Sequence, residues 1–521
     1  MIGGSCRSLL WPSRCVGAQL RRGRAQGAPA LEHDEQISLE NALPFEAIPG
    51  PESVPFLGSM YKYLPGGEFS HLRDHPYELF NYKFKKYGKI FREQPRPGYT
   101  LLALLDPAHF REVYRQTGKT PHRITSTFAF MQKQRDKRNK PTGLFLSNGE
   151  EWYRLRKQLQ KEMMRPASIA AYLHAQEQVA DDFVTRLRKL RDETGEVPDL
   201  LQELYKWAME SVGVICFDAR LGALDPDLRL SATAERFIKA NNDVFEALHN
   251  LYFDFFKLYR LYETPDYKKF DRGTCTMWEI GEKYMQETLA RHREGKQGLV
   301  RDKDNLVLTL LSKPDLSFED AAMFAFDLFG AAVDTTGHSM SFNMVQLSRH
   351  PEVQERLRKE VLQVVPPGGQ VTEKEISQLR YLKAVVKETF RTMPTTNGNA
   401  KTFPHDVVIG GYRIPVGVEV LMFNSLTSRM PEYVENPDEY QPERWLRDLG
   451  ERAIEPEVVL PFGHGPRMCI GRRVAEQEIY LGLIKLMQNF RIEYHHPEPI
   501  EQAVRIVNRP SRPLRFKLVD L

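Results

Sequence analysis

A mainly α-helical chain that folds as one large domain is predicted by three observations. Apolar residues recur with helical periodicity over long stretches, the longest of which spans residues 318–348. Strand-like stretches are short, at residues 101–105 and 407–414. No linker rich in proline, glycine or serine and no low-complexity run divides the middle of the 521 residues.

The N-terminal segment differs in composition from the rest of the chain. Residues 1–31 contain five arginines and no acidic residue, and their apolar runs are short. This composition is typical of a mitochondrial transit peptide, which we place at residues 1–35, and it leaves 36–521 as the folded domain. A disordered tail is the alternative. Nowhere does the chain offer the roughly 18 or more apolar residues of a membrane-spanning helix.

Charge and cysteine content narrow the classes of function. The net charge of +4 comes from 73 basic and 69 acidic residues. Without the five N-terminal arginines the balance is 68 to 69, so the body is nearly neutral and no nucleic-acid partner is expected. The cysteines, at positions 6, 15, 216, 275 and 469, are too scattered for a disulfide framework, which fits a reducing compartment.

Two segments in the first half of the chain combine aromatic and basic side chains. Residues 150–164 predict a helix, and Trp152 and Arg156 share one of its faces because they are four positions apart. An arginine fork suits a carboxylate and an indole N–H adds a donor, although such pairs also occur on ordinary amphipathic helices. Residues 252–270 contain eight aromatic side chains interleaved with basic ones. This pattern indicates either core packing or a segment that dips into a membrane interface.

The helix predicted at 318–348 carries an unfavourable sequence at its centre. Asp334, Thr335 and Thr336 are consecutive, and aspartate and β-branched residues have low helix propensity. We therefore expect a role other than helix stability for Asp334 and Thr335. The alternative is a purely structural pair.

Further helices are predicted at 351–364 and 379–392. The second carries Glu388 and Arg391 at i and i+3, a pair that contributes only about 0.2–0.5 kcal/mol on an exposed helix. Lys383 and Lys387 are four apart and also share a face.

One cysteine lies in a glycine-rich loop that opens directly into a helix pattern. Residues 462–471 read FGHGPRMCIG, and the glycines around Cys469 permit tight backbone turns. A thiolate in such a loop meets the requirement for an axial ligand to haem iron. An inert buried cysteine is the alternative, whereas zinc lacks a second nearby cysteine.

The loop matches F-x-x-G-x-R-x-C-x-G at every fixed position, through Phe462, Gly465, Arg467, Cys469 and Gly471. The chain therefore resembles the cytochrome P-450 family of haem-thiolate monooxygenases over about residues 45–521. The resemblance implies a mainly α, single large cytochrome P-450 type domain with small peripheral β-sheets. It also implies haem b as cofactor, with Cys469 as the axial ligand.

The same resemblance implies roles for the other motifs. Asp334 and Thr335 match the acid–alcohol pair that delivers protons during dioxygen activation. Residues 128–139 resemble the loop that roofs the substrate pocket, with a surface loop as the alternative, and 252–270 lie at the substrate entrance. Lys401 stands where many relatives carry a propionate-binding arginine, and lysine keeps the charge but loses the fork. The implied haem-binding set is Trp152, Arg156, Lys401, Phe462, Arg467 and Cys469, and the implied structural network is Glu388, Arg391 and Arg444.

The transit peptide and the sequence GRRVAE at 471–476 resemble the mitochondrial subgroup. This implies a peripheral location on the inner membrane facing the matrix. It also implies electrons from a [2Fe-2S] ferredoxin and its NADPH-dependent reductase, with docking through Lys383, Lys387, Arg472 and Arg473.

The expected reaction is insertion of one oxygen atom into a C–H bond of a small lipophilic substrate, for which we favour a steroid-like or sterol-like lipid. A xenobiotic substrate is the alternative. A haem-thiolate isomerase would rearrange peroxides without electrons, and Asp334 and Thr335 argue against it. A non-catalytic haem-binding sensor is the remaining interpretation.

Overall fold

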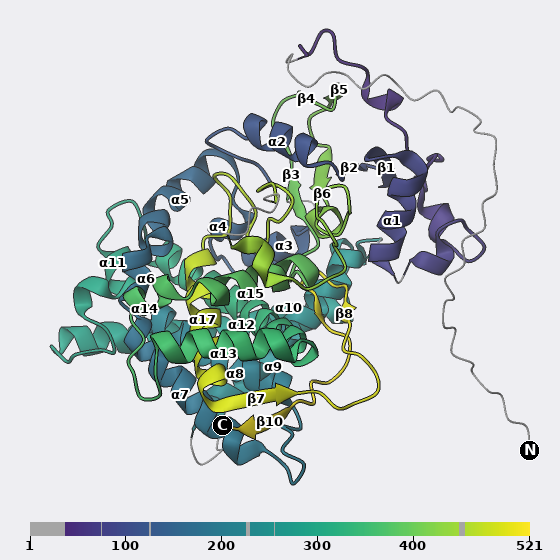
Figure 1. Cartoon of the computed structure of the whole chain (residues 1–521). Helices are drawn as coiled ribbons and strands as arrows, with labels where there is room; N and C mark the ends of the chain where they lie inside the picture. The colour runs from purple at the N-terminus through teal and green to yellow at the C-terminus, as the bar shows by residue number, and fades with distance from the viewer. Residues whose placement is uncertain (1–36, 74, 124–126, 226–229, 255, 447–453) are drawn as a thin grey trace, which may run out of the picture.

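A computed structural model describes residues 37–73, 75–123, 127–225, 230–254, 256–446 and 454–521. The transit peptide predicted at residues 1–35 lies outside these ranges. The fold is mainly α-helical with small sheets, as predicted (Figure 1). Among the described helices, none combines the length and the apolar composition needed to cross a membrane.

Helices make up most of the described chain. The first half contains α1 (Pro76–Tyr87), α2 (Pro107–Gln116), α3 (Ala129–Lys137), α4 (Gly143–Leu146), α5 (Gly149–Met164), α6 (Pro166–Ala170), α7 (Leu173–Leu190), α8 (Leu200–Phe217) and α9 (Ala232–Phe253). The second half contains α10 (Pro265–Arg293), α11 (Leu306–Leu311), α12 (Phe318–Arg349), α13 (Pro351–Val364), α14 (Glu373–Gln378), α15 (Arg380–Thr392), α16 (Asn424–Thr427) and α17 (Arg472–Asn489).

The helix α12 runs through the core of the molecule and packs against α8, α10, α15 and α17. It begins at a capping box, in which the Ser317 hydroxyl accepts from the backbone N–H of Asp320 and the Asp320 carboxylate accepts from that of Ser317. Its C-terminal half is buried almost completely. A Cβ at Gly337 would lie 2.7 Å from the ring of Tyr205, so a glycine allows the close approach of α8.

The largest sheet has four strands in the order β1 (Ile90–Arg96), β2 (Tyr99–Leu104), β6 (Glu419–Met422) and β3 (Asn399–Lys401). β2 and β6 are parallel, whereas the outer pairs are antiparallel. The other sheets are two-stranded and pair β4 (Val407–Ile409) with β5 (Tyr412–Ile414), β7 (Phe490–Glu493) with β10 (Lys517–Asp520), and β8 (Gln502–Ala503) with β9 (Arg509–Pro510). Figure 1 shows the four-stranded sheet at one edge of the helical body, near α1.

The predicted helices at 150–164, 318–348, 351–364 and 379–392 correspond to α5, α12, α13 and α15. The strand predicted at 101–105 is β2, and the stretch at 407–414 forms the β4–β5 hairpin.

The expectation of a loop at 128–139 is wrong, because these residues form α3. Phe130 is fully buried there, with its ring edge against Tyr259 and Phe270. These contacts come from a segment more than a hundred residues away, so tertiary packing supplies what local propensity does not.

Candidate functional site

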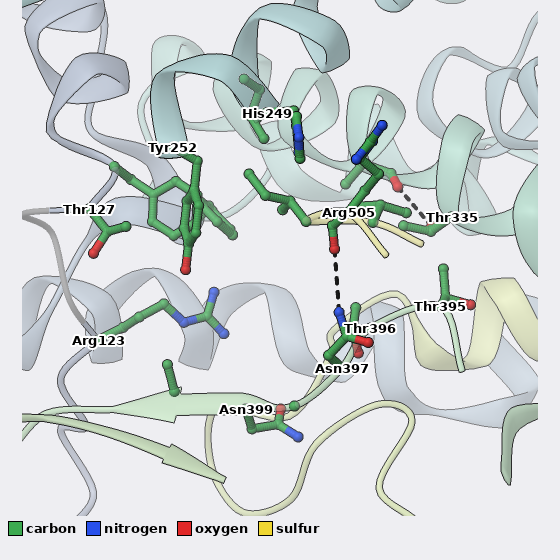
Figure 2. A pocket seen from close by; sticks show the side chains of 18 of the residues that line it. Arg123, Thr127, His249, Tyr252, Thr335, Thr395, Thr396, Asn397, Asn399 and Arg505 are labelled. Carbon is green, nitrogen blue, oxygen red and sulfur yellow. Dashed lines mark hydrogen bonds between the residues drawn. The ribbon is translucent and has the colours of Figure 1, made fainter. Parts of the chain in front are cut away.

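A cavity of about 1530 Å³ lies among α3, α5, α9, α12, the four-stranded sheet and the loop at 461–471. Most of its wall is apolar, and the polar side chains are gathered in a few places. Figure 2 shows part of this wall, with Arg123, Thr127 and Tyr252 on one side and Thr395, Thr396 and Arg505 on the other. A large apolar cavity with a few placed polar groups is typical of a small-molecule site.

Cys469 presents its thiol to this cavity. Its loop is held by two backbone hydrogen bonds, from the N–H of Cys469 to the Phe462 carbonyl at 2.8 Å and from Met468 to Gly465 at 3.1 Å. Gly463 and Gly465 have φ values of 70° and 77°, a region that glycine adopts without strain. The loop therefore fixes the cysteine immediately before α17.

The thiol of Cys469 has a raised pKa because the group is surrounded by protein. The backbone N–H of Gly471 and the positive charges of Arg156, Arg123 and Arg472 act in the opposite direction and favour the thiolate. The loop thus stabilises the thiolate form of Cys469, which burial otherwise disfavours.

Four cations, Arg123, Arg156, Lys401 and Arg467, form what we call the basic cluster. Burial lowers the pKa of Arg156 to about 10, that of Arg467 to about 9 and that of Lys401 to about 7, and it also lowers that of Arg123. Mutual repulsion contributes to the shifts of Lys401 and Arg467. Within the described part of the chain, no ion pair to an acidic side chain is recorded for any of the four.

Arg467 is the best-bound member of the basic cluster. Its guanidinium donates to the carbonyls of Pro121, Phe145 and Ser147 and to the side chain of Asn148. It thereby ties the cysteine loop to the start of α5. Arg156 and Arg467 both lie over the ring of Trp152, at 5.9 and 5.4 Å from its centre.

The cavity fits a haem group. Uncompensated cations inside a protein are costly, and the two propionates of haem b supply the negative charge that the basic cluster lacks. Cys469 supplies an axial sulfur in the same cavity. Trp152, Arg156, Phe462 and Arg467 also line the cavity, whereas Lys401 is 5% exposed behind it, 5.7 Å from the centre of the Tyr114 ring.

Asp334 and Thr335 point in different directions from α12. Thr335 lines the cavity, and its hydroxyl donates to the carbonyl of Ala331 at 2.8 Å (Figure 2). Asp334 is buried against α9, where the side chain of Asn241 donates to its carboxyl group. Burial raises the pKa of Asp334 to about 7, although the Asn241 bond and the charge of Arg509 oppose the shift.

Glu388, Arg391 and Arg444 meet in a buried network. Both oxygens of Glu388 accept from Arg391, at 2.8 and 2.9 Å, and one of them accepts from Arg444 at 3.0 Å. Trp445 donates its indole N–H to the same carboxylate at 2.9 Å. Glu388 and Arg391 are 0% exposed, so the pair is not the ordinary surface pair that its spacing also permits.

Of the four cations considered for partner docking, two bind one carboxylate, that of Glu476. Arg472 and Arg473 both donate to Glu476, at 2.8 and 3.0 Å. Lys387 is exposed and lies 5.6 Å from the centre of the Trp445 ring, whereas Lys383 is half-buried and donates to the carbonyl of Ser377. Burial lowers the pKa of Lys383, Glu360 and Glu476 oppose the shift, and Lys387 adds to it.

The aromatic segment at 252–270 divides into an inner and an outer part. Tyr259, Tyr267 and Phe270 are at most 2% exposed and belong to the core. Phe253 and Phe256 are 54% and 69% exposed, and Leu261 and Tyr262 are exposed as well. Core packing therefore accounts for the inner part, and the membrane interpretation stays a prediction for the exposed outer part. Phe255 lies outside the described residues.

Several residues of the cavity escaped the sequence analysis. Arg123 belongs to the basic cluster, but it is an isolated residue before α3 and no motif marks it. His249, Glu419 and Arg505 line the cavity from three separate segments. Trp445 belongs to the Glu388 network rather than to the cavity wall, and it could have been found because it directly follows Arg444 in the sequence.

A helical body in which one cysteine and the three arginines of the basic cluster line a large apolar cavity defines a haem-thiolate protein. The cytochrome P-450 family matches residues 48–518. The chain belongs to the cytochrome P-450 family, whose members are monooxygenases that bind haem through a cysteine thiolate.

Curated relatives cover nearly the whole chain. Cytochrome P-450 10 of Lymnaea stagnalis is 31% identical over 91% of this chain and 85% of its own length. Two Drosophila melanogaster proteins carry the word mitochondrial in their names. Probable cytochrome P-450 12a5, mitochondrial, is 33% identical over 92% of both chains. Cytochrome P-450 302a1, mitochondrial, is 30% identical over 92% of this chain and 96% of its own.

Proposed function

We propose that this chain is a mitochondrial monooxygenase that inserts one oxygen atom of dioxygen into a C–H bond of a steroid-like or sterol-like lipid. Electrons come from NADPH through a [2Fe-2S] ferredoxin and its reductase. The observation that carries this proposal is the meeting of Cys469, Thr335 and members of the basic cluster in one cavity. A cavity of about 1530 Å³ with a mainly apolar wall suits a haem together with a bulky lipid.

The residues divide the work in the proposed enzyme. Cys469 ligates the haem iron, and the basic cluster binds the propionates with support from Trp152. When bound, haem supplies the activation of dioxygen, which no side chain of the protein can perform. The apolar wall excludes water and holds the substrate, and the network around Glu388 supports the cysteine loop.

Asp334 and Thr335 supply protons in this proposal. With a pKa of about 7, the carboxyl group of Asp334 both holds and releases a proton near neutral pH. Thr335 carries its hydroxyl at the cavity wall, one residue further along α12. Because Asp334 faces Asn241 of α9, its carboxyl group must turn toward the cavity or use a bridging water before its proton reaches the Thr335 hydroxyl and then the cavity.

Thr335→Ala and Asp334→Asn are expected to uncouple NADPH consumption from product formation. Both variants interrupt proton supply while leaving the haem-binding residues in place, so product per NADPH falls about tenfold or more and peroxide rises. Thr185→Ala is the matched control, because Thr185 also donates to the carbonyl four residues earlier but lies on the surface of α7. Coupling that matches the unmodified enzyme in both variants would refute the proton-supply role.

Electron transfer is proposed to occur at the face that carries Lys383, Lys387, Arg472 and Arg473. The first two lie on α15 and the others at the start of α17, directly after the cysteine loop. Arg472 and Arg473 pair with Glu476, and the charges of Glu476 and Lys387 act on Lys383, which supports a single patch. Such a patch favours an acidic protein and acts mainly on the association rate.

Lys383→Gln combined with Lys387→Gln is expected to weaken ferredoxin-supported turnover several-fold at low ionic strength. The loss shrinks as salt is added, because screening removes the steering that the lysines provide. Substrate affinity and peroxide-driven turnover stay normal. The control is Lys283→Gln with Lys296→Gln, two exposed lysines of α10 and its C-terminal loop. Equal losses in the peroxide-driven and ferredoxin-driven assays would mean that the α15 lysines support the fold instead.

A peripheral position on the inner membrane, facing the matrix, is proposed from the exposed apolar side chains at the end of α9 and in the segment that leads to α10. Phe253 is one of these side chains and also lines the cavity, so a membrane contact there places the cavity mouth against the lipid. A lipophilic substrate then enters from the bilayer without crossing water.

Substrate binding is the experiment that tests the proposed class. Sterols, steroids and drug-like compounds should be titrated into the haem-loaded protein, and a spectral shift of the haem reports displacement of water by substrate. Sterol binding followed by NADPH- and ferredoxin-dependent hydroxylation is the expected result. Turnover restricted to drug-like compounds would replace the lipid substrate by a xenobiotic one, and electron-independent conversion of peroxides would indicate an isomerase.

A further inference from the structure

The cavity wall contains a buried carboxyl group that none of the roles above uses. Glu419 lines the cavity from the start of β6 and is 3% exposed. At the other end of β6, Met422 pairs with Asn399. The side chain of Asn399 lies beside Gly463 of the cysteine loop, since a Cβ added to Gly463 would be 2.9 Å from the Oδ1 atom of Asn399. Three residues of a strand span about 10 Å, so Glu419 lies about that far along β6 from the cysteine loop.

Glu419 has one hydrogen bond within the described part of the chain. The hydroxyl of Tyr99 donates to its Oε2, and no group of the described residues donates to its Oε1. Tyr99, Arg96 and Tyr252 line the cavity near this carboxyl group, and the guanidinium of Arg96 lies 5.2 Å from the centre of the Tyr99 ring. Figure 2 shows that the hydroxyl group of Tyr252 is directed into the cavity. We call the group formed by Glu419, Tyr99, Arg96 and Tyr252 the polar corner.

The carboxyl group in the polar corner is suited to a hydrogen bond with a ligand. Burial raises the pKa of Glu419 to about 7, against the Tyr99 bond and the charge of Arg96. Near neutral pH both the protonated and the ionised form are therefore populated, and the group accepts or donates as its partner requires. A buried carboxyl group with an open hydrogen-bonding position gains free energy when a ligand fills that position.

The charges around the polar corner restrict the chemistry of that ligand. Arg96, Lys257 and Asp254 also line the cavity. Burial lowers the pKa of Lys257 to about 8, the charge of Arg96 lowers it further and Asp254 opposes the shift. The two cations outnumber Asp254 and disfavour a protonated amine. A ligand carboxylate would be repelled by the ionised form of Glu419. An uncharged hydroxyl group avoids both penalties and, with one donor and two acceptor positions, pairs with Glu419 in either protonation state.

We propose that Glu419 and Tyr99 bind a hydroxyl group at the end of the substrate that lies away from Cys469. The inference rests on the proposed function, since it describes the lipid that the same cavity holds. The substrate class is therefore a lipophilic alcohol, anchored at one end in the polar corner and oxidised at the other. Glu419 and Tyr99 are specificity-determining residues in this proposal.

The experiment compares ligands that differ only at the anchored end. The haem-loaded protein is titrated with a saturated sterane that carries a 3-hydroxyl group, a 3-amino group or no substituent at that carbon, and with the corresponding 3-hemisuccinate as a carboxylate. The haem spectral shift gives each Kd. A second series uses a linear terpenoid alcohol and its parent hydrocarbon. We expect the hydroxyl compounds to bind about tenfold more tightly than their unsubstituted parents.

Variants assign that preference to the polar corner. Glu419→Leu and Tyr99→Phe should each reduce the tenfold preference for the alcohol to about twofold or less, whereas affinity for the unsubstituted parent stays within about twofold. Tyr99→Phe removes a single oxygen atom and keeps the inference testable if the leucine variant does not fold. Thr127→Val removes another polar group from the cavity wall and should leave the preference unchanged.

The two series separate this inference from the proposed substrate class. A Glu419-dependent preference for the terpenoid alcohol, without binding of steranes, supports the polar corner and overturns the steroid proposal. Sterane binding with no preference for the hydroxyl group, or with a preference that survives both variants, overturns the polar corner and leaves the steroid proposal standing. Tighter binding of the amine or of the carboxylate than of the alcohol also overturns it.

Discussion

Replacement of Cys469 by histidine should abolish the red-shifted absorption band that the reduced carbonyl complex of a haem-thiolate protein shows. The band depends on a sulfur ligand, and imidazole nitrogen donates less charge to iron. Because the backbone N–H of Gly471 and the nearby arginines favour a negative charge at this position, a neutral imidazole is poorly matched to the loop. Monooxygenase turnover should fall by about a hundredfold or more, because losing the ligand itself should cost at least as much as the roughly 10–100-fold typical of losing a group that orients a ligand.

The measurement is the difference spectrum of the reduced protein with and without carbon monoxide, together with haem content. Cys275→Ser is the matched control. Cys275 is half-buried, its thiol donates a hydrogen bond to Asp271, and it does not line the cavity. An unchanged red-shifted band in Cys469→His would require another sulfur ligand and would overturn the proposed site.

Replacement of Glu388 by alanine should destabilise the protein severely. The change leaves Arg391, which is 0% exposed, and Arg444 without the carboxylate that pairs with both, and the loss of one partner of a buried ion pair costs about 3–5 kcal/mol. The indole N–H of Trp445 and the backbone N–H of Gln441 also lose their acceptor. We expect little soluble haem-loaded protein and a clearly lower thermal midpoint in what remains.

Thermal unfolding and haem retention measure this effect. Glu151→Ala is the control, because Glu151 pairs with Arg154 at the same i,i+3 spacing, but its side chain is 52% exposed. A surface pair of this kind contributes about 0–1 kcal/mol, so the control should unfold almost as the unmodified protein does. Similar losses in both variants would show that burial does not set the strength of the Glu388 network.

The parts of the site that could be predicted are those whose functional residues lie close together in the sequence. The cysteine loop spans ten residues, and Trp152 and Arg156 share a face of α5 because helical periodicity alone places them there. The consecutive pair of Asp334 and Thr335 stands out because it opposes local helix propensity. The sequence did not predict in which direction each side chain points. Thr335 faces the cavity, whereas Asp334 faces Asn241 of α9.

By itself the sequence determined the helical class, four of the helices (α5, α12, α13 and α15) and the motif that identifies the family, since each depends on residues within a few turns of one another. Only the tertiary structure decided which side chains share a cavity. It added Arg123 to the basic cluster, placed Lys401 behind the cavity wall, buried Glu388 and brought Tyr99 to Glu419 across two paired strands. These contacts link residues tens to hundreds of positions apart, and they form because burial of apolar surface fixes the strands and helices that carry them.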